Sequence, residues 1–235
     1  MAYATVTWAG GRAERAEKTD HGFRVVDADG QSHEAKRLVL ATGVIDDLPP
    51  IPGLAERWGR FAFHCPYCHG YELMNGRIGV IAASPLSMHH AMMLPDWGPT
   101  TLLLNNAFEP DAEQRAQLER RGVVLEAEPI REVGGERADV MLTDGRILPF
   151  EGLFILQRTC MASPLGEQLG CDLEEGPLGT FIKTDATKET SVPGVFACGD
   201  AARAAGSVAL AVGDGSLAGA ATHQSLIFRD DAYSV

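Results

Sequence analysis

Two cysteines separated by two residues form the part of this chain whose residue types and spacing could carry out redox chemistry. Cys65 and Cys68 enclose a Pro-Tyr pair, and His69 follows the second cysteine directly. Thiols at this spacing can close and reopen a small disulfide ring without large backbone movement, and the thiolate is the attacking species. A neighbouring imidazole can lower a thiol pKa or carry the proton. The segment therefore predicts thiol–disulfide exchange, with Cys65, Cys68 and His69 as its catalytic residues.

Three other interpretations of this segment compete with redox exchange. The pair could be a structural disulfide or two buried thiols, although so short a bridge restricts the unfolded chain very little. The order Cys-x-x-Cys-His also occurs at c-type haem attachment sites, which accompany export, and the opening residues do not predict a secretory signal. A zinc site would use His64 with the three residues named above, but a structural zinc site needs a second ligand pair at a distance. The sequence has no second Cys-x-x-Cys, so redox exchange is favoured.

Composition and charge exclude several classes of protein. The chain has 235 residues, of which 45% are hydrophobic and 22% charged, as in an ordinary globular protein. Its net charge of −12 predicts repulsion from phosphate backbones and anionic membranes, so nucleic acid is not an expected partner. No run of about 18 apolar residues predicts a membrane span. One close cysteine pair and three scattered cysteines predict reduced thiols in the cytoplasm rather than a disulfide framework.

The elements that must position the thiols follow an α/β pattern. Buried-type strands are predicted at residues 38–40, 77–81, 101–104, 123–125, 153–156 and 195–198. Helices are predicted at residues 85–94, 111–121 and 207–228, and hairpin turns at 29–30 and 143–145. Strands alternating with helices in this way predict two Rossmann-like doubly wound domains, the second inserted in the first.

A segment rich in proline and glycine, residues 48–53, predicts the place where the chain crosses between these domains. We therefore expect residues 1–58 and 152–235 to form one domain. Residues 59–151 would form the inserted domain, which carries the redox pair.

Four motifs in order along the chain resemble the thioredoxin-reductase-like branch of the FAD-dependent disulfide oxidoreductases. They occupy residues 38–43, 51–53, 65–72 and 191–200. The third reads Cys-Pro-Tyr-Cys-His-Gly-Tyr-Glu and looks most like the bacterial and fungal dithiol oxidases that close disulfides in small natural products. The resemblance covers nearly the whole chain. It implies a flavin-linked thiol–disulfide oxidoreductase with FAD as cofactor, a small-molecule dithiol or disulfide or a thioredoxin-like protein as partner, and a homodimer.

The resemblance also assigns roles to individual residues. The cofactor-binding residues that it implies are Ala41, Thr42, Gly43, Gly199, Asp200, Ser207 and Val208. Of these, the Asp200 carboxylate corresponds to the group that binds the ribityl and pyrophosphate region, and the last two begin a helix whose N-terminus faces the flavin. Cys68 corresponds to the cysteine nearest the flavin and Cys65 to the interchange thiol that meets the substrate. His69 takes the acid/base position.

Two departures from the family pattern change what is expected. Family members open with a strand, a Gly-x-Gly-x-x-Gly turn and a helix that hold the FAD pyrophosphate, and none of these is present, so we expect an N-terminally truncated member in which the first FAD-binding βαβ unit is missing. Residues 213–218 fit a related glycine pattern but lie in an expected helix, where small residues would pack the helix against a sheet. Residues 82–87 replace the second glycine-rich turn by Ala-Ala-Ser-Pro-Leu-Ser, which argues against NAD(P)H binding.

Three functions stay open at this point. The chain could be a dithiol oxidase, an NAD(P)H-dependent thioredoxin-reductase-type disulfide reductase running in the opposite direction, or a non-catalytic remnant that acts as a binding subunit. The direction depends on donor binding and redox potential, which residue patterns do not determine. Among the remaining features, the Met- and His-rich stretch at 88–93 predicts core and helix surface rather than a metal site. Cys160 and Cys171 are expected to be buried thiols.

Overall fold

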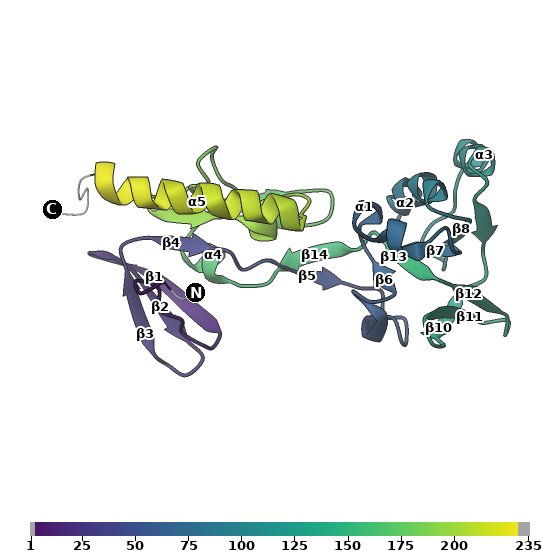
Figure 1. Cartoon of the computed structure of the whole chain (residues 1–235), viewed down its shortest axis with the longest axis horizontal. Helices are drawn as coiled ribbons and strands as arrows, with labels where there is room; N and C mark the ends of the chain where they lie inside the picture. Colours follow the sequence, from purple (N-terminus) through teal and green to yellow (C-terminus); the bar gives the residue numbers. More distant parts are fainter. Residues whose placement is uncertain (1–2, 230–235) are drawn as a thin grey trace. The chain divides into compact units, whose positions relative to one another are not determined.

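The structure is a computed structural model that describes residues 3–229, and it divides into two compact units (Figure 1). Unit 1 combines the residues up to Asp46 with those from Thr159 onward, and unit 2 is Asp47–Arg158. The chain leaves and re-enters unit 1 through β5 (Val44–Asp47) and β14 (Arg158–Met161), which pair as a two-stranded ribbon. Each unit is described here by itself.

The boundaries of unit 2 lie outside the residue range 59–151 that the sequence predicts for the inserted domain. On the N-terminal side, Ile51 and Leu54 are buried in the core of unit 2, so the proline-rich segment is part of this unit rather than a free linker. On the C-terminal side, β13 (Gly152–Ile155) pairs with strands of unit 2. Burial of side chains far apart in the sequence therefore decides where the units divide.

Unit 2 is built on a parallel five-stranded sheet in the order β6-β13-β7-β8-β9. Besides β13, its strands are β6 (Ala62–Phe63), β7 (Ile78–Ile81), β8 (Thr100–Leu103) and β9 (Val124–Glu126). All four side chains of β7 and all four of β13 are buried, which is the pattern expected of a parallel sheet covered on both faces. The predicted α/β fold with a parallel sheet is confirmed.

Helices cover one face of this sheet. They are α2 (Ser87–Met93) and α3 (Ala112–Arg120), with the short 3-10 turn η3 (Leu94–Asp96) after α2. Leu94 and Leu118 pack with Val80 and Leu102 of the sheet in one apolar cluster. Asp111 begins α3 with a capping box, in which its carboxylate accepts from the backbone of Gln114 at 2.8 Å.

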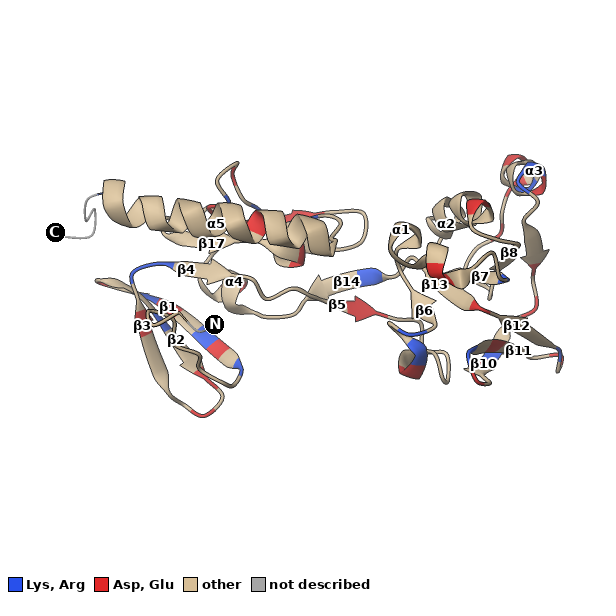
Figure 2. Cartoon of the chain, in the orientation of Figure 1, with Lys and Arg blue, Asp and Glu red and all other residues tan. Residues whose placement is uncertain are grey.

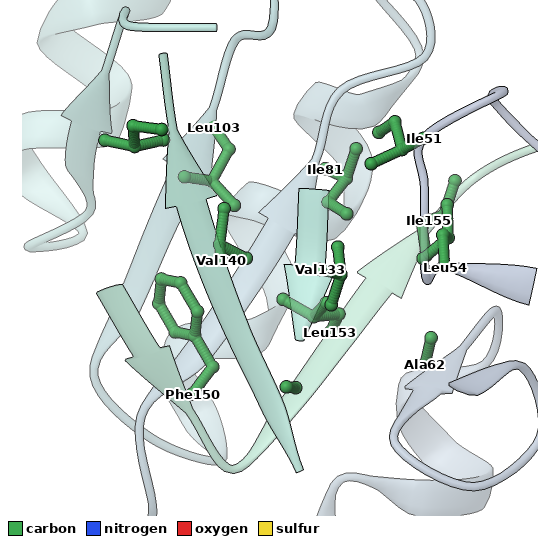
Figure 3. Close-up of a cluster of buried hydrophobic side chains, with 12 residues drawn as sticks. Ile51, Leu54, Ala62, Ile81, Leu103, Val133, Val140, Phe150, Leu153 and Ile155 are labelled. Atoms are coloured by element: carbon green, nitrogen blue, oxygen red, sulfur yellow. The ribbon is translucent and has the colours of Figure 1, made fainter. Parts of the chain in front are cut away.

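A small antiparallel sheet covers the other face. Its strands are β10 (Ile130–Gly134), β11 (Ala138–Leu142) and β12 (Ile147–Phe150). Val140 and Phe150 from this sheet meet Ile81, Leu103 and Leu153 from the parallel sheet in a second apolar cluster (Figure 3). The alternation of side chains along each parallel strand thus divides the core of unit 2 into two layers.

Unit 1 contains several small sheets. An antiparallel sheet is formed by β1 (Ala13–Thr19), β2 (Gly22–Asp27) and β3 (Ser32–Ala35), and the expected turn at residues 29–30 joins the last two. The parallel pair β4 (Leu38–Leu40) and β17 (Val195–Ala197) aligns Leu40 with Ala197. An antiparallel pair, β15 (Leu173–Glu175) and β16 (Thr180–Ile182), and the short helix α4 (Leu165–Gln168) complete the layer under the long helix α5 (Val208–Phe228). The core of unit 1 includes Phe23, Leu40, Ile182 and Val195.

Helix α5 is held by polar contacts rather than by a buried apolar stripe. Only Asp214, Ala218 and Ser225 are buried, and Figure 2 shows a single acidic band on an otherwise uncharged helix. Asp214 pairs with Arg203 at 2.6 Å and with Lys188 at 3.0 Å, while Ser225 accepts from Arg37 at 2.9 Å. The small residues at 213–218 were expected to pack on a sheet. Ala218 does so, because it packs with Phe196 of β17, whereas Gly213 and Gly215 meet no atom within 4 Å where a Cβ would lie.

Strand β1 was not predicted from the sequence, because six of its seven residues are not buried and only Ala16 is buried in the core. The short turns η1 (Ala55–Arg57), η2 (Tyr71–Leu73) and η4 (Gly199–Ala202) also lack a periodic signal. Among the residues that the structure describes, no helix has both the length and the apolar character that a membrane span requires.

Candidate functional site

The two thiols lie in a short helical segment of unit 2. Helix α1 (Pro66–His69) begins after β6, and Cys65 is its N-cap residue in an extended conformation. Pro66 occupies the first helical position, where its missing N–H costs no hydrogen bond. The Cys68 N–H donates to the Cys65 carbonyl at 3.2 Å, so one tight turn brings the two side chains together. Both cysteines are free thiols, with Cys65 half-buried and Cys68 exposed.

The two thiols differ in how they ionise. A hydrogen bond with Cys65 is the main cause that raises the pKa of Cys68 to about 11, and burial and the negative charges of Cys65 and Glu72 raise it further. A donor whose pKa rises in this way keeps its proton, so the Cys68 thiol donates to the Cys65 sulfur. Cys68 is therefore the protonated member of the pair at neutral pH, and the Cys65 sulfur accepts its hydrogen bond.

His69 is oriented by the edge strand of the sheet. Its ring stacks on Phe63 of β6, with the centroids 4.1 Å apart and the planes within 12°. The His69 Nδ1 is buried and has no hydrogen-bond partner among the described residues. An imidazole that is held in place but not consumed by a structural hydrogen bond is suited to carry a proton.

Aromatic side chains surround the thiols. Tyr67, between the two cysteines, is 78% exposed, and its ring meets the edge of Trp97 at a centroid distance of 5.5 Å. Trp97 lies so close to Gly70 that a Cβ at this glycine would be 2.7 Å from the indole ring. The sequence analysis missed Trp97 and Phe63, because neither lies next to the thiols along the chain and no local pattern connects them.

In unit 1 the residues assigned to a cofactor gather at one edge of the parallel pair β4–β17. The segments 41–43 and 199–200 follow the carboxyl ends of these neighbouring strands, which is where open α/β sheets bind ligands. Gly43 and Gly199 have φ of 69° and 66°, a left-handed conformation that glycine adopts without strain. The Asp200 Oδ1 is buried and has no hydrogen-bond partner among the described residues.

The start of α5 lies against the same carboxylate. A Cβ at Gly206 would lie 1.9 Å from the Asp200 Oδ1, so only glycine lets the carboxylate take this position. Ser207 caps the helix by accepting from the Leu210 N–H at 3.3 Å. Val208, the first helical residue, is 83% exposed. The structure therefore brings Asp200 next to the start of α5, as expected from the assigned roles.

The corresponding turn of unit 2, residues 82–87, follows β7. Several of its backbone donors are already used: the Ala83 N–H donates to the Ser87 hydroxyl at 3.0 Å, and the Ser87 N–H donates to the Ser84 carbonyl at 3.0 Å. The Leu86 N–H donates to the Ser84 hydroxyl at 3.3 Å, and Pro85 has no N–H. A pocket of about 370 Å³ opens beside this turn and is lined by Asp47, Leu48, Pro49, Pro50, Ala82, Ala83, Asn105, Ala107 and Arg158.

This turn does not fit the pyrophosphate of a dinucleotide. Glycine-rich turns bind phosphate because several backbone N–H groups point at it without another partner. Here the Ser87 side chain, which is fully buried, takes the place of the phosphate oxygen at the Ala83 N–H. The pocket wall carries one carboxylate, from Asp47, and one cation, from Arg158.

The other cysteines differ from the pair. Cys171 is buried, as expected, and contacts the Thr190 hydroxyl at 3.5 Å, and Cys198 is also buried. Cys160 was expected to be buried, but it is exposed because its strand, β14, lies in the two-stranded ribbon outside the cores. Within residues 3–229, no three His, Cys, Asp or Glu side chains are grouped so that they could hold a metal ion.

The fold and these sites define a class of protein: an α/β oxidoreductase that exchanges electrons between a dithiol and a flavin. The chain matches the pyridine nucleotide-disulphide oxidoreductase family over residues 5–215 and belongs to that family. It is 30% identical to thioredoxin reductase aclD of Aspergillus oryzae, an alignment that covers 98% of this chain and 77% of that protein.

Solved structures agree with this assignment. An oxidoreductase from Agrobacterium tumefaciens superimposes with a TM-score of 0.91 at 54% identity, covering 97% of this chain and 77% of that one. A putative thioredoxin reductase, TrxB, from Bacillus anthracis gives 0.87 at 26% identity, with the same coverage of 97% and 77%. The expected family, fold class and FAD-dependent oxidoreductase activity on disulfides are confirmed.

The FAD that this family uses fits the residues of unit 1. A buried carboxylate oxygen without a partner needs a hydrogen-bond donor, and the hydroxyls of a ribityl chain are such donors. Asp200 would hold this part of the cofactor, and Gly43 and Gly199 leave the strand ends open to it. Ser207 and Val208 would present the N-terminal end of a 21-residue helix, whose dipole stabilises negative charge.

Proposed function

We propose that this chain is a flavin-linked thiol–disulfide oxidoreductase that works through Cys65 and Cys68 and runs in the direction of dithiol oxidation. The observation that carries the proposal is the pair of free thiols on one tight turn, in which Cys68 keeps its proton through its hydrogen bond with Cys65. The direction is supported by the turn at residues 82–87, in which the N–H groups of Ala83, Leu86 and Ser87 already have partners within the turn.

The exchange balances in two steps on the protein's own sulfurs. In the oxidised enzyme Cys65 and Cys68 form a disulfide, and a substrate thiolate attacks the Cys65 sulfur, which breaks the bond and releases Cys68. The second substrate thiolate then attacks the substrate sulfur of the mixed disulfide, which releases Cys65 and the oxidised substrate. His69 takes up the proton that the substrate thiol loses and supplies one to Cys68. FAD held by Gly43, Gly199 and Asp200 would supply the acceptor for the two electrons released when Cys65 and Cys68 re-form their disulfide, with dioxygen as the final oxidant.

Exposed aromatic side chains beside the thiols support a small-molecule dithiol as the substrate, and a thioredoxin-like protein is the other substrate to be assayed. We also propose that unit 1 binds the flavin and that unit 2 carries the dithiol. We place the enzyme in the cytoplasm because all five cysteines are free thiols. The exposed apolar side chains of α5 support a homodimer, which light scattering of the purified protein would test.

The deciding experiment is anaerobic mixing of the FAD-loaded protein with dithiothreitol, NADH or NADPH. The absorbance of oxidised flavin at about 450 nm reports electron arrival. We expect dithiothreitol to bleach the flavin and both nicotinamides to leave it unchanged. Rapid bleaching by NADPH would reverse the proposed direction in favour of a disulfide reductase. Protein that stays colourless after FAD is added would instead support a non-catalytic binding subunit.

A further inference from the structure

A tyrosine between the two redox cysteines has its ring held in place while most of its surface stays open. Tyr67 lies between Cys65 and Cys68 and is 78% exposed. Its ring meets Trp97 edge to face, with the centroids 5.5 Å apart and the planes at 86°. Edge-to-face contact is a favourable arrangement of aromatic rings, so it restricts where this surface side chain stands. Neither ring takes part in the sulfur chemistry of the proposed exchange.

Trp97 is itself fixed by the fold of unit 2. Its N–H donates to the Leu94 carbonyl at 2.9 Å, and its half-buried ring packs against the apolar cluster beneath the helices. The indole also lies on the main chain of Gly70, where a Cβ would be 2.7 Å from two of the indole carbons. A side chain that is distant along the chain therefore fixes the ring that stands between the thiols.

Large apolar side chains gather on the surface just after the thiols. Tyr71 and Met74 are 80% and 77% exposed, close to the value for Tyr67. Exposed apolar side chains that lie together mark binding surfaces more often than scattered ones do. Among the described ring pairs, Tyr67 is the member of this group that a second ring holds. A ring that is already held loses less conformational freedom on binding, so Tyr67 should contribute more than its neighbours.

The charge of this segment indicates which molecules it would accept. No Lys or Arg occurs from residue 61 to residue 76, and Glu72 is the one carboxylate there. Glu72 lies in η2, four residues after the second thiol, a spacing that places both side chains on one face of a helical segment. In the loop that leads to the tryptophan, Asp96 and Arg121 pair at 2.8 Å, so their charges balance. The surface should therefore repel anions and accept neutral molecules.

We propose that Tyr67 determines substrate specificity by stacking on a ring of the substrate, so that the substrate class is a neutral small-molecule dithiol that carries an aromatic ring. Trp97 is a positioning residue, because it acts through Tyr67. The inference rests on the proposed function and names the substrate class of the same site. Anionic dithiols and dithiols without a ring are the poorer substrates.

Three alkylating reagents that share one reactive group test the proposal on the reduced full chain, with no need for flavin or turnover. Iodoacetamide is small and neutral, N-benzyliodoacetamide adds a ring, and iodoacetate carries a negative charge. Labelling rates at Cys65 and Cys68 are measured by peptide mass spectrometry, with exposed Cys160 of unit 1 as the reference in the same chain. Because two reagents are compared at the same thiols, a change in thiol ionisation cancels from the ratio of their rates.

In the wild-type chain we expect the benzyl reagent to label the pair about three- to tenfold faster than iodoacetamide, relative to the same ratio at Cys160, which is the size of effect that one aromatic pair produces. Tyr67→Ala should abolish this preference. Trp97→Leu should weaken it at least about twofold, and Trp97→Phe, which keeps a ring, should retain most of it. Tyr71→Ala is the matched control, because Tyr71 is equally exposed but lies outside the ring pair, and it should keep the preference.

The charge is tested separately. Glu72→Gln should raise the rate of iodoacetate relative to iodoacetamide by about twofold at low salt, and the difference from the wild type should disappear at high salt. An iodoacetate rate that does not change in this variant would contradict the selection of neutral substrates.

Two results would overturn the role of Tyr67. A preference for the benzyl reagent that is absent from the wild type, or that Tyr67→Ala leaves intact, would show that this ring does not bind another. An equal loss in Tyr71→Ala would show that any exposed ring near the thiols has the same effect.

A kinetic measurement connects the labelling result to the proposed exchange. Flavin reduction by 1,2-benzenedimethanethiol should reach half its limiting rate at a lower concentration than reduction by dithiothreitol, and Tyr67→Ala should remove this difference. If neither dithiol reduces the flavin of the wild-type protein, the proposed function fails, whereas the labelling ratios still decide whether Tyr67 binds a ring.

Discussion

Two turns that follow parallel strands in the two units have opposite properties. After β17 of unit 1, Gly199 takes a left-handed conformation and Asp200 keeps a buried oxygen without a partner among the described residues. After β7 of unit 2, the turn at residues 82–87 has no glycine, and three of its N–H groups, those of Ala83, Leu86 and Ser87, donate to Ser84 or Ser87. Both turns stand at the carboxyl ends of strands, where such sheets bind ligands.

The difference teaches that the fold supplies a place for a ligand but not the binding itself. Binding of a phosphate or a sugar needs polar groups that the protein has left without partners, because a donor already satisfied gains nothing from the exchange. Unit 1 retains such a group. In unit 2 the polar groups of the corresponding turn already have partners within the protein, and this unit contributes the thiols instead. This difference between the two units can be tested by substitutions in each of them.

Removal of the sulfur in unit 2 that the substrate attacks should have the largest effect. In Cys65→Ser we expect the rate of flavin reduction by dithiothreitol to fall at least about 10³-fold, because a hydroxyl cannot take part in disulfide exchange. Cys160→Ser, which replaces an exposed thiol of unit 1, should stay within about twofold of the wild-type rate. Stopped-flow absorbance measures both. Fast reduction in Cys65→Ser would remove unit 2 from the electron path.

A single methyl group placed beside the unpaired carboxylate should disrupt the cofactor edge of unit 1. In Gly206→Ala the new Cβ would lie 1.9 Å from the Asp200 Oδ1, so the carboxylate must move. We expect the Kd for FAD to rise by about 10- to 100-fold, measured by fluorescence titration. Gly213→Ala is the control, since its Cβ meets no atom within 4 Å and the helix gains up to about 1 kcal/mol. Equal affinity in both variants would argue against Asp200 as a flavin ligand.

The ion pairs that Asp214 of α5 makes with Arg203 and Lys188 should stabilise the folded protein. Arg203 is the main cause that lowers the pKa of Asp214 to about 2, with Lys188 contributing, from an ordinary value of 3.8. Because the folded pKa is the lower one, the stabilisation is present above about pH 4 and is lost as the pH falls toward 2. Asp214→Asn should therefore lower the free energy of unfolding in urea by about 2 kcal/mol at neutral pH. The difference between this variant and the wild type should become smaller in acid. A difference in unfolding free energy that does not depend on pH would contradict stabilisation by the ion pair.

Freeing the occupied donor in unit 2 should have the smallest effect. Ser87→Ala releases the Ala83 N–H, and one restored donor is worth about 1 kcal/mol, so NADPH should bind no more than about fivefold more tightly. Equilibrium dialysis with both nicotinamides measures this change, and Ser84→Ala, which frees the Leu86 N–H, serves as a comparison. Tight binding of NADPH to the wild-type chain would show that the turn accepts phosphate despite its internal bonds.

Patterns between neighbouring residues were enough to predict much of the molecule. The parallel strand at 78–81 is an apolar run and the strand at 100–103 ends in one, and α3 begins with a capping box, so local sequence specifies these elements. The dithiol was recognisable for the same reason, since Cys65 and Cys68 are close along the chain. By contrast, β1 carries charged residues at most positions, and only its pairing with β2 makes it a strand.

The sequence by itself determined the chemistry available, namely a reactive thiol pair, an adjacent imidazole and a turn without glycine after β7. The tertiary structure alone decided how these groups are held and which of them are still free to react. The contacts of Phe63 with His69, of Gly206 with Asp200 and of Tyr67 with Trp97 follow no spacing rule. Each depends on which surfaces pack together when the chain collapses, and burial then decides whether a polar group needs an outside partner.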